Sequence, residues 1–306
     1  MKVVINTSNF GEHDTTPLEK LKQAKWQYAL NPYKRQLTEK EVIELSQDAV
    51  GLIAGNEPLN KHVLTNLKAV KVISRCGVGK DNIDLTTAEK LGIKVFCTPN
   101  GPTLAVAELT VGLILNLLRK INGMDADVRS GLWKKQMGYL LKDKKVGIVG
   151  FGRIGQKVAQ LLSVFGAEVG YCDIQKITCE IPCRSMPFEE LLKWADIVSL
   201  HLFAREDGKP IINAKELKLM QKGSWLINVA RGSLVDEEAL YEALKSDHLS
   251  GAALDVFSHE PYQGRLKTLN NVILTPHIGS YAVESRIEME LQAVENLIAG
   301  FKGGSK

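Results

Sequence analysis

The sequence has few cysteines, and their arrangement argues against a zinc site. The five are Cys76, Cys97, Cys172, Cys179 and Cys183, an odd number at irregular spacing. The last three cluster, but no CxxC pair or nearby histidine completes the ligand set that zinc needs. This pattern is typical of a reduced, cytoplasmic protein whose thiols are ordinary core or loop residues. We therefore expect a cytoplasmic location and no metal site.

The sequence also lacks the usual features of membrane and nucleic-acid-binding proteins. Its most apolar helical segment, around Val111–Leu118, is shorter than the ~20 residues that a membrane span needs. The N-terminus, MKVVINTSNF, turns polar after a short apolar run, which suits a first β-strand better than a signal peptide. Lys and Arg number 39 against 35 Asp and Glu, a net charge of +4, with no basic block. Because nucleic-acid binders usually concentrate their basic residues, we expect neither nucleic acid nor a membrane as partner.

What the chain does contain is the size and pattern of a two-domain α/β protein. Its 306 residues fit two domains of ~150 residues each, and 44% hydrophobic with 24% charged residues is ordinary for a globular protein. Short apolar runs alternate with helical patterns, which indicates parallel sheets with helices on their faces. In the first hundred residues we predict helices over Glu39–Ser46 and Leu85–Leu91, and strands over Lys2–Thr7, Val50–Ala54, Val70–Arg75 and Val95–Cys97.

A long helix after Pro102 separates this series from a second one. Thr103 is a plausible helix cap, and Val106, Leu109, Leu113 and Leu117 recur at a period near 3.6. Six strands follow, predicted over Val146–Val149, Glu168–Cys172, Ile197–Leu202, Trp225–Val229, Ala252–Val256 and Val272–Thr275, and a final helix over Val283–Ala299. We expect the two long helices to cross between the domains. The prediction is two doubly wound parallel-sheet domains, one formed by residues 98–282 and the other by 1–97 plus 283–306.

Residues 146–155, VGIVGFGRIG, combine an apolar strand with a GxGxxG turn that opens a helix. Gly150 allows the sharp turn, Gly152 allows the backbone to approach a pyrophosphate, and Gly155 allows the helix to pack on its strand. Asp173 ends the next strand, 173 − 152 = 21 residues after Gly152, close to the ~20 expected for an acid that binds the adenosine ribose. Ile174 and Gln175 follow it without an arginine, so the pattern favours NAD over NADP. The alternative is a purely structural turn with a solvated aspartate.

Three segments in the last quarter stand at predicted strand ends, where open α/β sheets place their ligands. They are INVARGSLVD (227–236), LDVFSHEP (254–261) and LTPHIGS (274–280). Taken singly, Arg231 could cap a turn, Glu260 could be a loop carboxylate and His277 could be a core imidazole. Together they match reduction of a 2-keto acid, because arginine binds a carboxylate, histidine donates a proton and a carboxylate orients the imidazole.

With these motifs in order, the sequence resembles the D-2-hydroxyacid dehydrogenase family, which includes phosphoglycerate, glyoxylate/hydroxypyruvate and formate dehydrogenases. The segments RCGVGKDNIDL (75–85) and TPNGPTLAVAELTVGLIL (98–115) look like its substrate loop and inter-domain helix. The resemblance implies a Rossmann-like NAD domain, a flavodoxin-like substrate domain, an active site in the cleft between them and a homodimer formed through the long-helix region. Phe203 stands where the family usually has proline, and Ala282 where it often has threonine, which puts the geometry of the cofactor loops in doubt.

The resemblance also assigns roles to individual residues. Arg231 would bind substrate, His277 would be the acid/base and Glu260 its carboxylate partner, while Asp255 would hold the nicotinamide amide. The remaining cofactor positions are Gly150, Gly152, Arg153, Ile154, Gly155, Asp173, Leu202, Val229, Ala230 and Gly279. Val78 and Gly79 would offer backbone N–H groups to the substrate carboxylate, and Arg75 would hold a distal phosphate.

The identity of the 2-hydroxy acid and the direction of the reaction are left open by the motifs. The stretch around Arg75 favours 3-phosphoglycerate/3-phosphohydroxypyruvate slightly over glyoxylate or hydroxypyruvate, although LIAGNEPLN (52–60) lacks the second basic residue of many phosphoglycerate enzymes. One alternative is a related enzyme of the same architecture with different chemistry, which would use bound NAD as S-adenosylhomocysteine hydrolases do. A second, of a different class, is an NAD-sensing corepressor, which would keep the same three residues. The chain lacks the extension or length that these would need.

Overall fold

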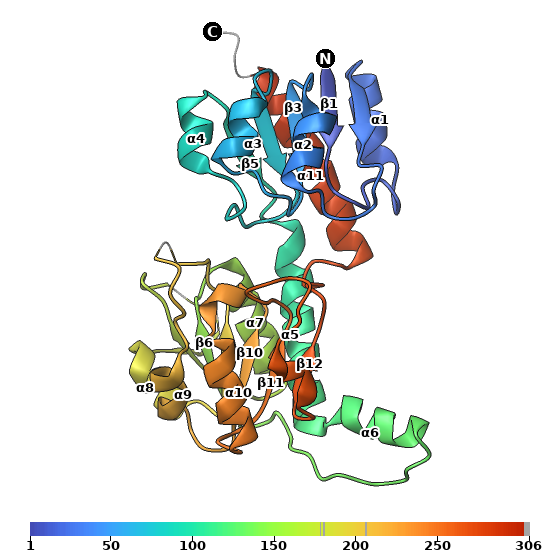
Figure 1. Cartoon of the computed structure of the whole chain (residues 1–306). Coiled ribbons are helices and arrows are strands. Elements are labelled where there is room, and N and C mark those ends of the chain that lie inside the picture. Colours follow the sequence, from blue (N-terminus) through green and yellow to red (C-terminus); the bar gives the residue numbers. More distant parts are fainter. Residues whose placement is uncertain (178, 180, 206, 303–306) are drawn as a thin grey trace. The chain divides into compact units, whose positions relative to one another are not determined.

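The computed structural model describes residues 1–177, 179, 181–205 and 207–302. The chain divides into two compact units, of which one is formed by Met1–Ala105 with the segment from Ser280, and the other by Val106–Gly279. Each unit contains a parallel β-sheet with helices on its faces, as predicted from the alternating pattern (Figure 1). The helix α5 (Gly101–Arg119) runs from the first unit into the second, and the chain returns to the first unit before α11 (Val283–Lys302).

The first unit has a five-stranded sheet in the order β2-β1-β3-β4-β5. Its strands are β1 (Lys2–Ile5), β2 (Gln27–Leu30), β3 (Gly51–Ala54), β4 (Val72–Arg75) and β5 (Lys94–Cys97). One face packs on α1 (Thr16–Gln23) and α11, around Leu21, Ile53 and Leu297. The other carries α2 (Glu39–Ser46), α3 (Lys61–Asn66) and α4 (Leu85–Lys90). The strand order reverses between β1 and β3, which is where sheets of this order bind ligands beyond the strand ends.

The second unit has a seven-stranded sheet in the order β12-β11-β10-β9-β6-β7-β8. Its strands are β6 (Lys145–Val149), β7 (Glu168–Cys172), β8 (Arg184–Ser185), β9 (Ile197–Leu200), β10 (Ser224–Asn228), β11 (Leu249–Leu254) and β12 (Val272–Leu274). Helices α5 and α7 (Arg153–Val164) cover one face. Helices α8 (Phe188–Trp194), α9 (Ala214–Leu219) and α10 (Glu237–Lys245) cover the other. Short 3-10 turns lie at Gly232–Leu234 and Arg265–Thr268.

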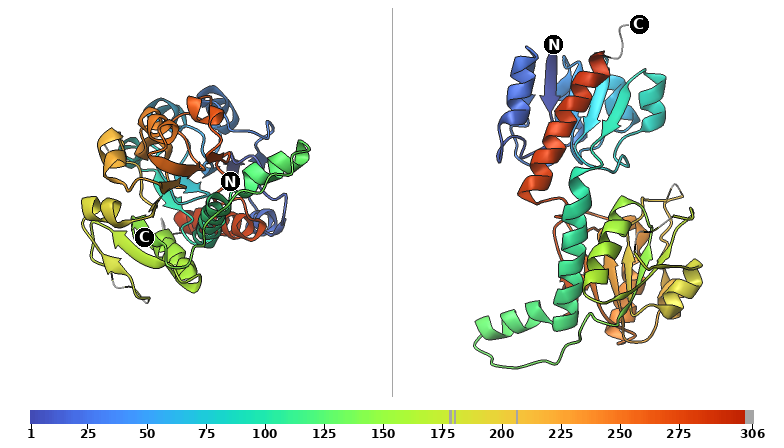
Figure 2. Two further views of the ribbon diagram at one scale, coloured as in Figure 1. Left: turned by 90° about the horizontal axis from the view of Figure 1, so that it is seen from below. Right: turned by 180° about the vertical axis from the view of Figure 1, so that it is seen from behind.

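Helix α6 (Ile121–Arg129) and the segment after it extend away from the rest of the second unit (Figure 2). This helix was not predicted, because no residue in it is buried and it carries no apolar face toward a core. The strand β2 was also missed, since QYAL at the sheet edge is only partly buried. The two-residue strand β8 is too short to leave a period in the sequence. Helices α1 and α3 were not singled out, although they are as long as the predicted helices α2 and α4, respectively.

Two expectations about α5 were wrong. The helix begins at Gly101, so Thr103 lies inside its first turn and donates its hydroxyl to Pro99 O at 3.0 Å instead of capping the helix. The apolar segment is also longer than Val111–Leu118: all 19 residues are helical, with a mean hydropathy of 1.6, long and apolar enough to cross a membrane. Half of that stretch is buried, and Val111, Leu113 and Ile114 belong to the core of the second unit. This burial is typical of the core helix of a globular domain.

Candidate active site

The turn after β6 has the shape that a dinucleotide pyrophosphate requires. Gly150 has φ +92°, and a side chain there would come within 2.5 Å of the carbonyl oxygen of His201. A side chain at Gly155 would collide with the Gly150 carbonyl, so both positions need glycine. Gly152 caps α7 and would meet no atom within 4 Å, which leaves the space beside the helix N-terminus open. Arg153 and Ile154 form the first turn of α7, where free N–H groups and the helix dipole favour a phosphate.

Asp173 lies directly after β7, beside this turn. Its Oδ2 accepts a hydrogen bond from Phe151 N at 2.6 Å and its Oδ1 one from Gln175 N at 2.9 Å. The carboxylate is therefore fixed next to the glycine turn. A cavity of about 480 Å³ is lined by Asp173, Ile174, Leu202, Arg205 and Ile211 among others, a size that suits an adenosine. Leu202 thus lies on the same cavity as Asp173, and the assignment of both residues to the cofactor site remains a prediction.

Arg231 follows β10 in a loop whose course is set by hydrogen bonds. Asn228 Nδ2 donates to Arg231 O at 2.9 Å, and Ala230 N donates to Asn228 Oδ1 at 3.1 Å. The Arg231 guanidinium donates to Ala230 O at 2.6 Å. A side chain at Gly232 would collide with the backbone of Phe257, so the loop after β10 packs closely on the loop after β11. This packing brings Arg231 near Glu260. Asn228 shapes the loop through its two hydrogen bonds, and the sequence analysis did not identify it.

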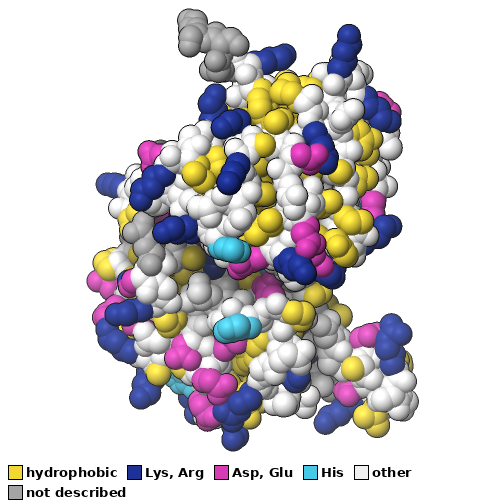
Figure 3. Space-filling model, turned by 45° about the horizontal axis from the view of Figure 1, so that its top comes forward, with side chains coloured by type: hydrophobic (Ala, Val, Ile, Leu, Met, Phe, Trp, Pro, Cys, Tyr) yellow, Lys and Arg dark blue, Asp and Glu magenta, His cyan; other side chains and the backbone are white. Residues whose placement is uncertain are grey.

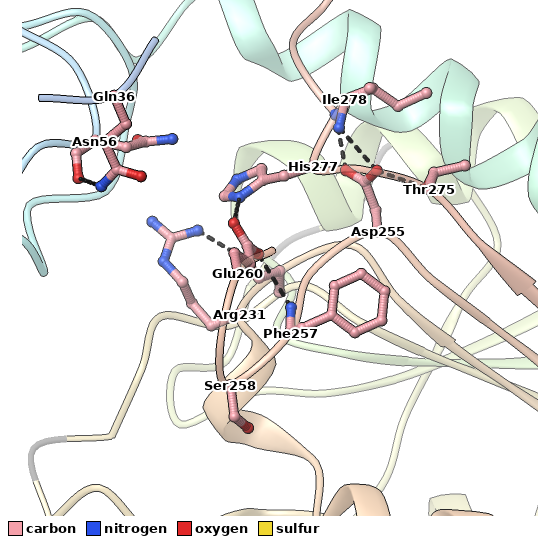
Figure 4. Close-up of polar contacts among 12 residues, drawn as sticks. Gln36, Asn56, Arg231, Asp255, Phe257, Ser258, Glu260, Thr275, His277 and Ile278 are labelled. Carbon is pink, nitrogen blue, oxygen red and sulfur yellow. Dashed lines mark hydrogen bonds and ion pairs between the residues drawn. The ribbon is translucent and has the colours of Figure 1, made fainter. Parts of the chain in front are cut away.

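His277 and Glu260 are paired (Figure 4). The imidazole Nδ1 lies 2.8 Å from Glu260 Oε2, and Glu260 Oε1 accepts from Phe257 N at 3.1 Å. His277 has φ +56° in a tight turn in which its N–H donates to Thr275 O at 3.0 Å. Burial raises the pKa of Glu260, but the hydrogen bond and charge of His277, together with the Phe257 N–H and the charge of Arg231, outweigh this and lower it. Glu260 is thus an anion at neutral pH. Because Glu260 pairs with Nδ1 of His277, the other ring nitrogen, Nε2, can interact with a different group.

The comparison with known proteins agrees with this geometry. Residues 111–279 match the family model described as "D-isomer specific 2-hydroxyacid dehydrogenase, NAD binding domain". The chain belongs to the D-isomer-specific 2-hydroxyacid dehydrogenase family. Like the other members it is an NAD-dependent oxidoreductase, which confirms the resemblance found in the motifs, the fold class and the choice of NAD as cofactor.

Several members of this family are similar over most of the chain. Glyoxylate reductase of Thermococcus litoralis is 43% identical over 81% of this chain and 78% of its own length. Hydroxypyruvate reductase of Thermotoga maritima is 38% identical over 75% and 77%, respectively. D-3-phosphoglycerate dehydrogenase of Bacillus subtilis is 36% identical, over 82% of this chain but only 49% of its own length. Among solved structures, the TT0316 protein of Thermus thermophilus has a TM-score of 0.90 at 38% identity, over 99% of this chain and 97% of its own.

Asp255 holds the loop that carries His277. The carboxylate is fully buried and accepts from Thr275 Oγ1 at 2.6 Å, Ile278 N at 2.8 Å and Gly279 N at 2.7 Å (Figure 4). Burial raises the pKa of Asp255, and these donors and the charge of His277 offset it only in part. Thr275, another residue that the motifs did not single out, supplies one of the three hydrogen bonds. The predicted contact of Asp255 with the nicotinamide amide remains a prediction.

Val229 and Ala230 are buried at the end of β10, and Gly279 is buried against Asp255 and Val106. His201, at the end of β9, is a neutral structural imidazole, because burial lowers its pKa to about 3 and its Nε2 lies 2.8 Å from Ser199 Oγ. Phe203, which replaces the usual proline of the family, is mostly exposed. Among the described residues no three His, Cys, Asp or Glu side chains are placed to hold a metal ion.

The predicted substrate loop, residues 75–85, lies in the first unit after β4. Val78 and Gly79 follow Gly77, which has φ +138° and turns the chain so that a side chain there would collide with the Arg75 guanidinium. Arg75 donates to Cys76 O at 2.8 Å and to the Asn56 side chain. The guanidinium that was predicted to receive a phosphate is therefore engaged with its own loop and its neighbour.

Proposed function

We propose that this chain is an NADH-dependent glyoxylate/hydroxypyruvate reductase. The His277–Glu260 pair with Arg231 beside it supports a keto-acid reductase, since it offers a proton donor, an orienting anion and a carboxylate-binding cation on adjoining loops. The named relatives support glyoxylate and hydroxypyruvate over the phosphorylated substrate favoured by the motifs. The contacts of Arg75 also count against a distal phosphate.

In this proposal each residue has one task. NADH, when bound at the glycine turn and Asp173, supplies the hydride. Arg231 binds the carboxylate and carbonyl of the keto acid, and Val78 and Gly79 offer backbone N–H groups to the carboxylate. His277 donates a proton from Nε2 to the carbonyl oxygen, while Glu260 holds Nδ1 and favours the charged ring. Asp255 keeps His277 in place by holding residues 275–279.

We further propose that residues 98–282 bind NAD and that residues 1–97 with 283–306 bind the substrate. These ranges differ by a few residues from the two compact units, whose divisions fall at Ala105 and Gly279. We also propose that the protein is a cytoplasmic homodimer, with a small-molecule 2-keto or 2-hydroxy acid as its reaction partner. The described cysteines are free thiols, as in a reducing compartment.

Steady-state oxidation of NADH with a panel of 2-keto acids tests the function. We expect kcat/KM for glyoxylate and hydroxypyruvate to exceed that for 3-phosphohydroxypyruvate by at least about a hundredfold, a difference of about 2.7 kcal/mol in transition-state binding. A preference for 3-phosphohydroxypyruvate would restore the phosphoglycerate assignment. No turnover of any keto acid, with NADH still bound, would instead favour an NAD-sensing binding protein.

A further inference from the structure

The two backbone N–H groups proposed to bind the substrate carboxylate lie in an irregular turn after β4. Val78 N and Gly79 N donate no hydrogen bond to any described residue, and Gly79 is buried. Adjacent N–H groups left without a protein partner are typical of a turn that binds an anion. Their direction therefore depends on how the residue before them, Gly77, is held.

Gly77 is held on both sides by Thr98, the residue that follows β5. Gly77 N donates to Thr98 Oγ1 at 2.7 Å, and Thr98 N donates to Gly77 O at 2.9 Å. Thr98 is fully buried, so water does not compete for its hydroxyl. Because hydrogen bonds are directional, one at the donor and one at the acceptor of the same residue fix both the position and the orientation of Gly77.

The contact between Gly77 and Thr98 replaces the regular pairing of β4 with β5. That pairing ends at Arg75 and Cys97, so the chain advances by 77 − 75 = 2 residues after β4 but by 98 − 97 = 1 after β5. The extra residue, Cys76, donates its N–H to the last carbonyl of β3 at 2.8 Å instead. An extra residue of this kind redirects the backbone, as a β-bulge beside an active site does. Gly77 follows with φ +138°, a conformation that favours glycine.

The far end of the predicted substrate loop is held separately. Asn82 Nδ2 donates to Glu57 O at 2.7 Å and to Gly55 O at 3.1 Å, and Leu59 N donates to Asn82 O at 2.8 Å. These bonds join the end of the loop to the segment after β3. Loss of the contact with Thr98 should therefore change the direction of the two N–H groups without releasing the whole loop.

We propose that Thr98 is a positioning residue for the substrate carboxylate, which acts through Gly77 and aims the N–H groups of Val78 and Gly79. This inference rests on the proposed function, in which those groups bind the carboxylate. The Thr98 hydroxyl is buried and occupied by Gly77 N, so Thr98 touches no substrate itself. Because every 2-keto acid has the same carboxylate, its effect should not depend on the far end of the substrate.

The test is Thr98→Val, which removes the hydroxyl, keeps the branched shape and leaves Gly77 N without its acceptor. We expect KM for glyoxylate to rise by about tenfold, the order expected when a buried donor loses its partner. The kcat should stay within about threefold of the wild type, because the lost binding is shared by the ground state and the transition state. KM for hydroxypyruvate should rise by the same factor, and the dissociation constant of NADH should not change.

Two matched variants separate this role from a general loss of stability. Thr98→Ser keeps the acceptor oxygen and should restore KM to within about twofold of the wild type. Thr87→Val removes another buried hydroxyl of the same unit, one that donates to Asp84 Oδ2 at 2.8 Å, and should leave KM unchanged. A role in stability alone would make both valine variants behave alike.

An unchanged KM in Thr98→Val that still binds NADH overturns the inference, as does an equal rise of KM in Thr87→Val. If Thr98→Val does not fold, Thr98→Ala takes its place under the same criteria. A wild type that reduces neither glyoxylate nor hydroxypyruvate defeats the proposed function instead. The keto acid that it does reduce then replaces glyoxylate in the comparison, because its carboxylate needs the same two N–H groups.

Discussion

Arg231, Glu260 and His277 come from three loops, and each is held by a neighbour whose part is hard to predict. These three residues were predicted as catalytic candidates from their residue types and from the order of the motifs. Asn228 and Thr275 could not be found in that way, because Asn228 bonds the backbone of its own loop and Thr275 bonds the carboxylate of Asp255, and only the fold sets these contacts. Arg75 shows the opposite case: its charge suggested a phosphate receptor, but its neighbours Cys76 and Asn56 engage it.

The Glu260 carboxylate should control the pH range of reduction. The lowered pKa of Glu260 means that the residue is an anion throughout the neutral range and favours the imidazolium that donates the proton. In Glu260→Gln the anion that faces Nδ1 of His277 is lost. We expect the fall in kcat/KM for glyoxylate to move to lower pH by about one unit. Glu237→Gln, at a partly exposed neighbouring carboxylate that holds Ser258 N, serves as control. An unshifted profile in Glu260→Gln would mean that the pair has no part in proton transfer.

At the scale of elements, the central strands and the motif-bearing turns were predictable from sequence, and the edges were not. Helix α2 and strand β7 have the predicted bounds, because a buried face gives each a clear period. Strands β2 and β8 lie at sheet edges where that period is weak, and α6 has no core to face. The glycine turn was predictable because steric demands at Gly150 and Gly155 leave little choice of residue.

The turn after β7 should decide between NADH and NADPH. Asp173 is fixed beside the glycine turn, where a carboxylate would accept the ribose hydroxyls and repel a 2′-phosphate. Ile174 is fully exposed, so Ile174→Arg costs no packing. We expect Asp173→Ser with Ile174→Arg to raise the ratio of kcat/KM for NADPH to that for NADH by about a hundredfold or more, because the repulsion is removed and the new guanidinium can bind the 2′-phosphate. Ile174→Arg alone is the control and should change the ratio much less. Equal use of both cofactors by the wild type would show that Asp173 does not face the ribose.

At the scale of the whole molecule, charge and apolar surface are distributed differently. Lys and Arg side chains are scattered across the face shown in Figure 3, in keeping with a small net charge of +4. Exposed apolar side chains instead gather on α6 and the segment that follows it, including Leu132, Trp133, Met137 and Leu140. Apolar surface of this extent is typical of an interface.

We expect a second copy of the chain to cover this surface. Trp133 and Met137 are 84% and 89% exposed, so Trp133→Ser with Met137→Ser should leave the fold of the unit intact while removing the most apolar contacts. Analytical ultracentrifugation should give twice the monomer mass for the wild type and the monomer mass for the double variant at micromolar concentration. Val164→Ser, at an equally exposed apolar residue at the end of α7, should remain dimeric. A monomeric wild type would contradict the proposed homodimer.

The measurement that tests the central claim most directly separates binding from catalysis at His277. In His277→Asn, NADH fluorescence titration should give a dissociation constant within about threefold of the wild type, because the residues of the glycine turn and Asp173 are untouched. The kcat for glyoxylate reduction should fall by ~10²–10⁴-fold, the range for loss of a general acid. A variant that binds NADH normally and still reduces glyoxylate within about threefold of the wild-type rate would contradict the account, because the proton would then come from another group.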